Sequence, residues 1–262
     1  MKINYKKKFD LKKKLAFVAG GSGYIGKEIV NGLISMNCKV VVLDIHNLRN
    51  DKIIFEHVDL SKTTYLEKKL KKIFKKYGAP HIFINASYPK TKDWKKNSFK
   101  RINLKSFENN IKSHLNSYVW CSKILATEMA KNKIKGSIVN LSSIYGLVGQ
   151  DLEIYKGTDM EENLSYSVIK GGINNLTRQM SSYYGKLGIR VNAICPGGVI
   201  NSEDKKYLRT QKSFEKRYTD KVPLKRFART DEVASAVIFL SSEASSYITG
   251  SLLTVDGGWT AI

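Results

Sequence analysis

The chain has 262 residues, of which 42% are hydrophobic, enough to bury the core of one ordinary domain and to exclude a disordered protein. Its 45 lysines and arginines against 23 acidic residues give a formal net charge of +22. The basic residues are scattered, and lysine contacts phosphates without reading bases, so we expect no sequence-specific binding to nucleic acid. Residues 1–13 are expected to form a basic, solvated N-terminal extension.

The cysteines and the apolar runs indicate the cellular compartment in which the protein is expected. Cys38, Cys121 and Cys195 are odd in number and far apart, which indicates neither a disulfide framework nor a metal site. The apolar run after the basic N-terminus is far shorter than the ~20 residues of a membrane span. We therefore expect a cytoplasmic protein that binds no metal and no membrane.

Short apolar runs alternate along the chain with longer segments whose apolar residues recur every three or four positions. The runs predict buried strands at Leu15–Ala19, Lys39–Asp44, Ile53–Val58, His81–Asn85, Ser137–Leu141, Ile189–Ile194 and Leu252–Val255. The longer segments predict helices at Ile25–Met36, Thr63–Lys76, Leu104–Asn132, Ser165–Leu187 and Asp231–Leu240. This alternation predicts a single α/β domain over 1–262, with a doubly wound, parallel seven-stranded sheet and helices on both faces.

Three stretches fit no strand and no expected core helix: Ala86–Arg101, the acidic stretch Tyr145–Asn163, and the polar stretch 201–221. Function concentrates on such loops, and the helical pattern of 201–221 makes it a candidate substrate lid. The alternative for all three is surface decoration.

A glycine-rich turn follows the first expected strand and opens the next helix. It consists of Gly20, Gly21, Ser22, Gly23, Tyr24, Ile25 and Gly26. Glycines there allow a tight turn and let backbone N–H groups approach a diphosphate at the positive helix end. Asp44 ends the second strand, where a carboxylate bonds both ribose hydroxyls and repels a 2′-phosphate. The glycine turn and Asp44 together predict NAD as the cofactor. Arg49, a few residues after Asp44, keeps NADP as the lesser alternative.

The second half of the chain holds the strongest catalytic signal. Ser143 follows the fifth expected strand, and Tyr166 and Lys170 are one turn apart on a helix, hence on one face. A phenol with a pKa of ~10 is a poor catalyst at neutral pH. A nearby ammonium is expected to lower that pKa and to make the phenol a usable acid and base.

Together these residues resemble the short-chain dehydrogenase/reductase family, over about Leu11 to Trp259. The similar motifs are the glycine turn, Asp59-Leu60, Asn85-Ala86-Ser87, Asn140–Gly146, Tyr166–Lys170, Arg190–Gly198 and Tyr247–Gly258. The resemblance implies that Tyr166 exchanges a proton with the substrate oxygen, that Ser143 bonds this oxygen, and that Lys170 holds the ribose. It also implies cofactor contacts from Asp59, Leu60, Asn85, Ala86, Ser87, Pro196, Gly197, Val199 and Asn201.

Three positions depart from the family pattern. His114 stands where an asparagine commonly completes a proton relay; either His114 takes part in that relay, or it packs at a helix interface and Asn110 or Asn116 serves instead. Tyr24 replaces a glycine, a spacing more typical of sugar-nucleotide epimerases and dehydratases. Asn201 replaces a threonine, and its amide is expected to keep that role.

The loops point to a class of substrate. Tyr88, Lys90, Lys92, Asp93, Trp94, Tyr145, Tyr155 and the basic residues of 205–216 favour a polyhydroxylated or anionic substrate over one needing an apolar wall. Asn85–Trp94, His114-Leu115 and Glu153–Thr158 also resemble the flagellin modification protein A subgroup, associated with bacterial surface sugars. This implies a sugar or sugar phosphate as substrate.

Two other functions stay open on the sequence: an epimerase or dehydratase that retains its NAD, and a non-catalytic scaffold. The family resemblance also implies a homotetramer or homodimer, formed through the helices at 104–132 and 165–187 and through the C-terminus. The apolar stripe on the first of these helices would equally suit packing on the sheet of a monomer.

Overall fold

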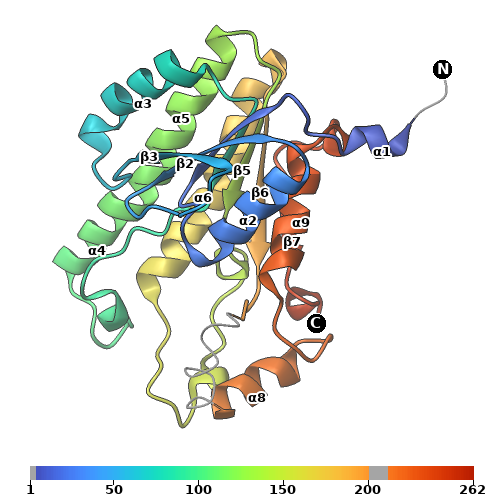
Figure 1. The fold of residues 1–262 in the computed structure, drawn as a ribbon. Helices are drawn as coiled ribbons and strands as arrows, with labels where there is room; N and C mark the ends of the chain where they lie inside the picture. The colour runs from blue at the N-terminus through green and yellow to red at the C-terminus, as the bar shows by residue number, and fades with distance from the viewer. Residues whose placement is uncertain (1–3, 201–211) are drawn as a thin grey trace.

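The computed structural model describes residues 4–200 and 212–262, and it is built around one parallel sheet (Figure 1). Its seven strands are β1 (Leu15–Ala19), β2 (Lys39–Asp44), β3 (Ile53–His57), β4 (Ile82–Asn85), β5 (Ser137–Leu141), β6 (Arg190–Pro196) and β7 (Leu252–Val255). They lie in the order β3-β2-β1-β4-β5-β6-β7, with every neighbouring pair parallel. The predicted doubly wound α/β fold is therefore confirmed, with strand ends shifted by one or two residues.

Helices cover both faces of the sheet. The main ones are α2 (Tyr24–Ser35), α3 (Thr63–Tyr77), α5 (Asn116–Lys131), α6 (Leu164–Tyr184) and α9 (Thr230–Ser241). Side chains alternate along a strand, so in β1 Ala16 and Val18 pack toward α2 and α9, whereas Phe17 packs toward α3 and α5. Both layers are needed because all five residues of β1 are buried.

The helix expected over Leu104–Asn132 is interrupted. It consists of α4 (Leu104–Asn110), one π-helical turn η2 (Ile111–Leu115), and then α5. The apolar periodicity cannot reveal an added residue in one turn, and for this reason the break was not expected. Such π turns are frequent at functional sites, and this one carries His114.

The N-terminal segment is not wholly a solvated extension. It forms the short helix α1 (Tyr5–Lys8), which Figure 1 shows projecting from the body, but Leu11 is buried in the core beside α2 and α9. The three cysteines are buried and unpaired as well. No helix within the described residues is both long enough and apolar enough to cross a membrane.

Shorter elements gather beyond the carboxyl ends of the strands. They are η1 (Trp94–Lys96), η3 (Ile144–Gly146), η4 (Leu152–Tyr155) and α8 (Lys212–Lys221). A separate apolar cluster joins η3, η4 and α8, with Ile154 of η4, Tyr218 of α8 and Trp259 of η8 (Trp259–Ala261) all buried in it. The described part of the lid candidate, α8, is thus helical as expected and is packed against η4.

Candidate active site

The predicted site residues meet at one edge of the sheet because parallel strands all end there. Gly20 follows β1, Asn85 ends β4, Ser143 follows β5, and Gly197 follows β6. The loops after these strands therefore lie together at the carboxyl edge of the sheet.

The glycine turn is packed too closely for side chains. A Cβ atom on Gly20, whose φ is +73°, would lie 2.5 Å from the Cα of Ser87, and one on Gly26 would lie 2.1 Å from the carbonyl oxygen of Gly20. Gly23 caps α2 in an extended conformation and has no side chain to cover the helix end. The turn is thus a cradle of backbone atoms at a positive helix end, which suits a diphosphate.

Asp44 is held beside this turn by backbone groups. The amide of Ser22 donates to one carboxylate oxygen at 3.0 Å, and the amides of Ile45 and His46 donate to the other at 2.7 and 3.1 Å. The hydroxyl of Ser22 donates to the carbonyl of His46 at 2.6 Å. The carboxylate is therefore fixed at the end of β2, next to the helix terminus.

The remaining predicted cofactor residues occupy neighbouring strand ends. The buried Asn85 accepts a hydrogen bond from the Ser87 hydroxyl at 2.7 Å, but its own side-chain amide nitrogen is buried with no partner. Asp59 instead accepts bonds from the amide and hydroxyl of Ser61, and Leu60 is buried in the core. A buried N–H donor without a partner lowers the stability of the fold, so its presence indicates that a bound group accepts this hydrogen bond.

Ser143, Tyr166 and Lys170 come together as expected. Ser143 and Tyr166 line the same cavity, and the Nζ of Lys170 lies 5.5 Å from the centre of the Tyr166 ring. Lys170 is only 3% exposed, and its Nζ donates to the carbonyl oxygen of Leu141 at 2.8 Å. The rings of Tyr88 and Tyr118 face the same Nζ at 5.9 and 5.3 Å.

Burial dominates the protonation of this group. It lowers the pKa of Lys170 to about 7, because the charged amine loses its hydration. Burial also raises the pKa of Tyr166 above its usual value, and the hydrogen bond from Ser143 opposes this only in part. The direction for Tyr166 is opposite to the one expected from a neighbouring ammonium, because desolvation is the largest influence on its pKa.

His114 is the one of the three relay candidates that lies close to this group. Its ring is fully buried, 5.1 Å from the ring of Tyr88 and 5.6 Å from that of Tyr118, with no hydrogen-bond partner for either nitrogen. Burial, aided by Lys170, lowers its pKa well below the usual value, so the imidazole is neutral.

The asparagines offered as alternatives to His114 are placed differently. Asn110 is engaged in the protein interior, where it accepts from the amide of Thr91 and donates to the side chain of Asn97 and the carbonyl of Ser106. Asn116 is exposed on α5. Neither is free to serve a buried relay.

A cavity of about 330 Å³ opens beside Ser143 and Tyr166. Tyr24 and the residues 197–200 line one part of it. Beyond Tyr166 the wall is aromatic, formed by Tyr145, Tyr155, Phe214, Tyr218 and Phe227. An apolar wall was not expected from the sequence.

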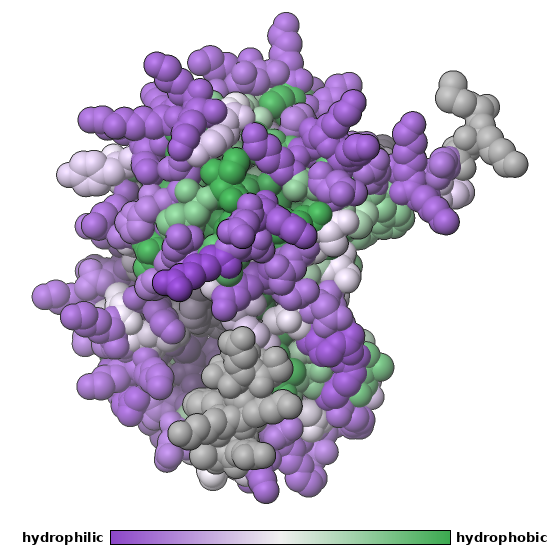
Figure 2. Space-filling view, in the orientation of Figure 1, coloured by the Kyte–Doolittle hydropathy of each residue, from purple (hydrophilic) through white to green (hydrophobic). Residues whose placement is uncertain are grey.

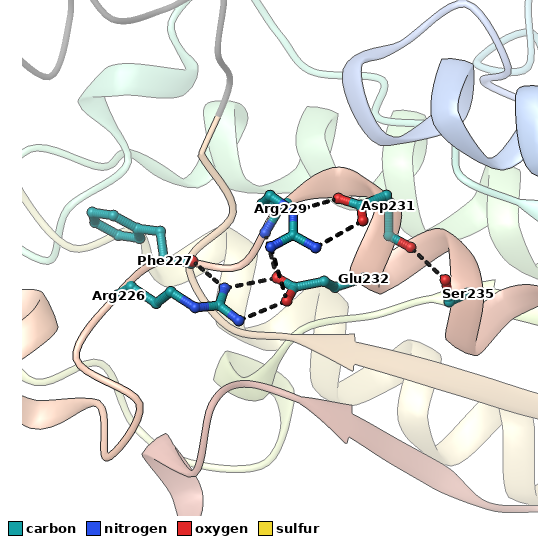
Figure 3. Close-up of polar contacts among 6 residues, drawn as sticks. All are labelled: Arg226, Phe227, Arg229, Asp231, Glu232 and Ser235. Atoms are coloured by element: carbon teal, nitrogen blue, oxygen red, sulfur yellow. Dashed lines mark hydrogen bonds and ion pairs between the residues drawn. The ribbon is translucent and has the colours of Figure 1, made fainter.

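Polar contacts at the start of α9 hold part of this wall in place (Figure 3). Glu232 accepts two hydrogen bonds from Arg226, at 2.8 and 2.6 Å, and one from the amide of Arg229 at 2.8 Å. Arg226 also donates to the carbonyl of Phe227 at 3.0 Å. The next residue, Ala228, pairs with Val199 in a parallel bridge, so Phe227 is held on both sides.

The structure corrects several expectations about the lining. Lys90, Lys92 and Asp93 do not line the cavity. Tyr88 and Trp94 do not line it either, but their ring centres lie 6.0 and 6.2 Å from the centre of the Tyr166 ring. Lys212 and Lys216 of α8 are exposed, and Asn201, Lys205, Lys206 and Arg209 lie outside the described residues. Sequence reasoning missed Phe214, Tyr218 and Phe227; the signal was Phe214 and Tyr218, two aromatics one turn apart on a polar helix.

The chain is similar to known proteins over nearly its whole length. A family model described as enoyl-(acyl carrier protein) reductase matches residues 19–260. The chain is 28% identical to the post-translational flagellin modification protein A of Campylobacter coli, with 95% of this chain and 99% of the relative covered. It is 30% identical to glucose 1-dehydrogenase 2 of Bacillus subtilis, with 96% of each covered.

A solved structure agrees with these relatives. The short chain dehydrogenase of Leptospira borgpetersenii, crystallised with bound NAD⁺, superposes with a TM-score of 0.83 at 28% identity. The comparison covers 99% of this chain and 97% of that one.

Proposed function

Since the chain belongs to the short-chain dehydrogenase/reductase family, we propose that it is an NAD-dependent oxidoreductase that interconverts a secondary alcohol and a ketone. The observation that carries the proposal is that Ser143 and Tyr166 line one cavity, with the buried Lys170 behind them and its Nζ 5.5 Å from the centre of the Tyr166 ring.

The residues present fit a nicotinamide dinucleotide. The diphosphate would be held by Gly20, Gly21, Ser22, Gly23, Tyr24, Ile25 and Gly26, and the adenosine by Asp44, Asp59 and Leu60. Asn85, Ala86, Ser87, Pro196, Gly197, Val199 and Lys170 would hold the nicotinamide half, with Asn201 added from outside the described residues. When bound, the nicotinamide supplies the hydride acceptor or donor. The fixed carboxylate of Asp44 favours NAD because it would repel the extra phosphate of NADP.

The chain's own residues would then manage the proton. Tyr166 takes the proton from the substrate hydroxyl during oxidation and returns it during reduction. Ser143 donates a hydrogen bond to the substrate oxygen and orients it. Lys170 positions the ribose and stabilises the phenolate, while the neutral His114 behind it accepts or passes a proton toward solvent.

The substrate is proposed to be a sugar or sugar phosphate in a pathway that modifies flagellin or another bacterial surface glycan. The similarity to the Campylobacter flagellin modification protein and to the Bacillus glucose dehydrogenase supports this class. We also propose a cytoplasmic enzyme, since its three cysteines are unpaired and buried, as suits a reducing compartment.

The test is a cofactor-coupled screen of sugars and sugar phosphates, read as NADH absorbance, with Tyr166→Phe as the variant. This variant should lose turnover by at least about 100-fold while its NAD affinity stays within a few-fold of the parent. Equal activity in the variant would end the assignment of Tyr166. Tightly retained NAD with no net change in NADH would instead favour an epimerase or dehydratase.

A further inference from the structure

The part of the cavity beyond Tyr166 is a stacked aromatic wall. Tyr155 lies 5.9 Å from Phe214 with an angle of 18° between the rings, and Tyr218 lies 4.8 Å from Phe227, also at 18°. Trp259 stacks on Tyr218 from behind at 4.5 Å. These rings come from η4, α8, the loop before α9, and the C-terminus, so the wall is fixed by four separate segments.

The part of the wall that the structure describes is formed by uncharged side chains. None of the described residues that line the cavity is charged. Three lysines near the wall are paired with acids: Lys221 with Asp151, Lys156 with Glu153, and Lys216 with Asp220. A phosphate that lay against this part of the wall would lose hydration, and no cation among the described lining residues would replace it.

Arg217 of α8 is a further cation in this region, packed against the loop at Gly157. Its Nη1 is buried without a hydrogen-bond partner, but the guanidinium lies against Gly157, about 3.9 Å from where a Cβ would stand. It does not line the cavity. Arg217 is therefore the described cation on α8 whose replacement tests for an anionic substrate.

The wall does offer hydroxyl groups. Tyr155 donates to Gln150 at 3.1 Å, and Gln150 is held by the carbonyl of Asn163 and the hydroxyl of Ser167. The buried hydroxyl of Tyr145 lies near that of Tyr155 but makes no well-formed hydrogen bond. Tyr145 therefore has a donor and an acceptor to offer a ligand that lies against the rings.

From this arrangement we infer that the substrate is an uncharged ring, a neutral sugar or cyclic polyol, whose apolar C–H face lies on the aromatic wall while one hydroxyl bonds Tyr145. A volume of about 330 Å³ suits one such ring beside a nicotinamide ring, near the low end of ligand pockets, ~300 Å³. The inference rests on the proposed function and narrows it, since it removes sugar phosphates and nucleotide-linked sugars from the candidates.

The experiment compares matched substrates. Glucose, myo-inositol and trans-1,2-cyclohexanediol are assayed with NAD⁺ beside glucose 6-phosphate, and acetoacetyl-CoA is assayed with NADH as a chain-like substrate. We expect kcat/KM for the best neutral ring to exceed that for glucose 6-phosphate by at least tenfold. A preference for glucose 6-phosphate that is lost in Arg217→Gln, or a preference for the thioester, would overturn the inference and leave the proposed function intact.

Two variants test the wall itself. Tyr145→Phe should raise KM for the neutral polyol about five- to tenfold with little change in kcat, the size expected for one lost hydrogen bond. Cyclohexanol, with a single hydroxyl held at Tyr166, should be unaffected by the same change. Tyr247→Phe, at a fully exposed tyrosine, is the matched control and should behave as the parent.

If none of these compounds is turned over, a binding measurement tests the inference instead. Calorimetric titration of the NAD⁺-loaded Tyr166→Phe variant with myo-inositol, glucose and glucose 6-phosphate should give heat of binding for the neutral rings only. Binding of the phosphate alone, or of none of the three, would overturn the inference. Failure of the protein to bind NAD⁺ at all would instead overturn the proposed function.

Discussion

Asp44 performs two tasks with one carboxylate. It accepts backbone hydrogen bonds from Ser22, Ile45 and His46, so it orders the loop after β2, and it presents negative charge beside the glycine turn. These tasks are only partly separable: an amide removes the charge, but its one oxygen can serve either Ser22 or the pair Ile45 and His46, and its nitrogen cannot accept from the other side.

The Asp44→Asn variant should therefore lose its preference for NAD, while the loop after β2 loses one of the backbone contacts that order it. We expect the ratio of kcat/KM for NAD to that for NADP to fall by at least about tenfold, since one lost charge–phosphate repulsion is worth over 1 kcal/mol. The measurement is steady-state kinetics with both cofactors. If the parent already uses NADP better than NAD, the argument from the ribose fails.

His114 should make the free energy of unfolding depend on pH. Its pKa in the folded protein is well below 6.5, whereas the unfolded chain takes up a proton near 6.5. The unfolded state then binds more protons below that pH, so the free energy of unfolding falls as the pH drops, by up to roughly 1.4 kcal/mol per pH unit. His81, whose pKa burial also lowers, acts in the same direction.

The His114→Asn variant keeps the His81 effect and removes the His114 effect. Urea unfolding between pH 7 and 5 should thus show a shallower pH dependence in this variant than in the parent. His57→Asn, at an exposed histidine on β3, is the control and should keep the parent's slope. Identical slopes for the parent and His114→Asn would contradict the neutral, buried state of this imidazole.

At the same scale, the sequence predicts some site residues far better than others. Ser143, Tyr166, Lys170 and the glycines follow from strand ends and helical spacing, which local pattern encodes. Phe227 could not be found in this way, since it reaches the cavity through a bridge between residues 199 and 228, far apart in the chain. The direction in which the pKa of Tyr166 shifts could not be predicted from the sequence either, because it depends on burial, and burial depends on packing from several segments.

Among the elements, the start of α9 connects helix capping with the shape of the cavity. Glu232 accepts from Arg226 and from the amide of Arg229, and this pairing lowers the pKa of Glu232 to about 2. The ion pair between Arg226 and Glu232 is partly exposed, so it adds little to the stability of the fold. Its main effect is to position the loop that carries Phe227.

Replacing Glu232 by Gln should lower the free energy of unfolding by only about 1 kcal/mol, the usual worth of a helix N-terminal contact. It should raise KM for the substrate several-fold, because Phe227 is no longer held from both sides. Chemical denaturation and steady-state kinetics provide the two measurements. Glu67→Gln breaks a comparable pair with Lys71 on α3 and should leave KM unchanged; an unchanged KM in both variants would contradict the positioning role.

The elements also mark a limit of pattern reading. Strand and helix order could be predicted because every strand is a short apolar run between amphipathic segments. The π turn that carries His114 could not, since one inserted residue leaves the apolar spacing of its neighbours nearly intact. The acidic stretch 145–163 proved to be more than decoration, because Ile154 anchors it and Tyr155 reaches the cavity.

On the scale of the whole molecule, the surface is strongly basic, and the face in Figure 2 is mainly hydrophilic. Large apolar side chains nevertheless stay exposed on the two central helices, with Trp120 of α5 45% exposed and Val168 of α6 42% exposed. We expect these helices to pack against a second copy of the chain, giving a homodimer or homotetramer.

Light scattering coupled to size exclusion should accordingly give two or four times the 29.6 kDa of one chain. Trp120→Glu should shift the protein toward smaller species, since a charge would be buried in the contact. Tyr65→Glu, at an exposed position of α3, should not. A parent that elutes as a monomer at micromolar concentration would contradict the expectation.

The buried cysteines have a practical consequence. All three thiols are enclosed, and burial raises the pKa of Cys38 to about 12 and that of Cys195 to about 11, so hardly any reactive thiolate is present at neutral pH. An added cysteine at an exposed position of α8, such as Ser213→Cys, would then be the sole site for a maleimide dye. With Trp94 and Trp120 replaced by Phe, fluorescence energy transfer from Trp259 to that dye would follow, in real time, how α8 responds when a ligand enters the cavity.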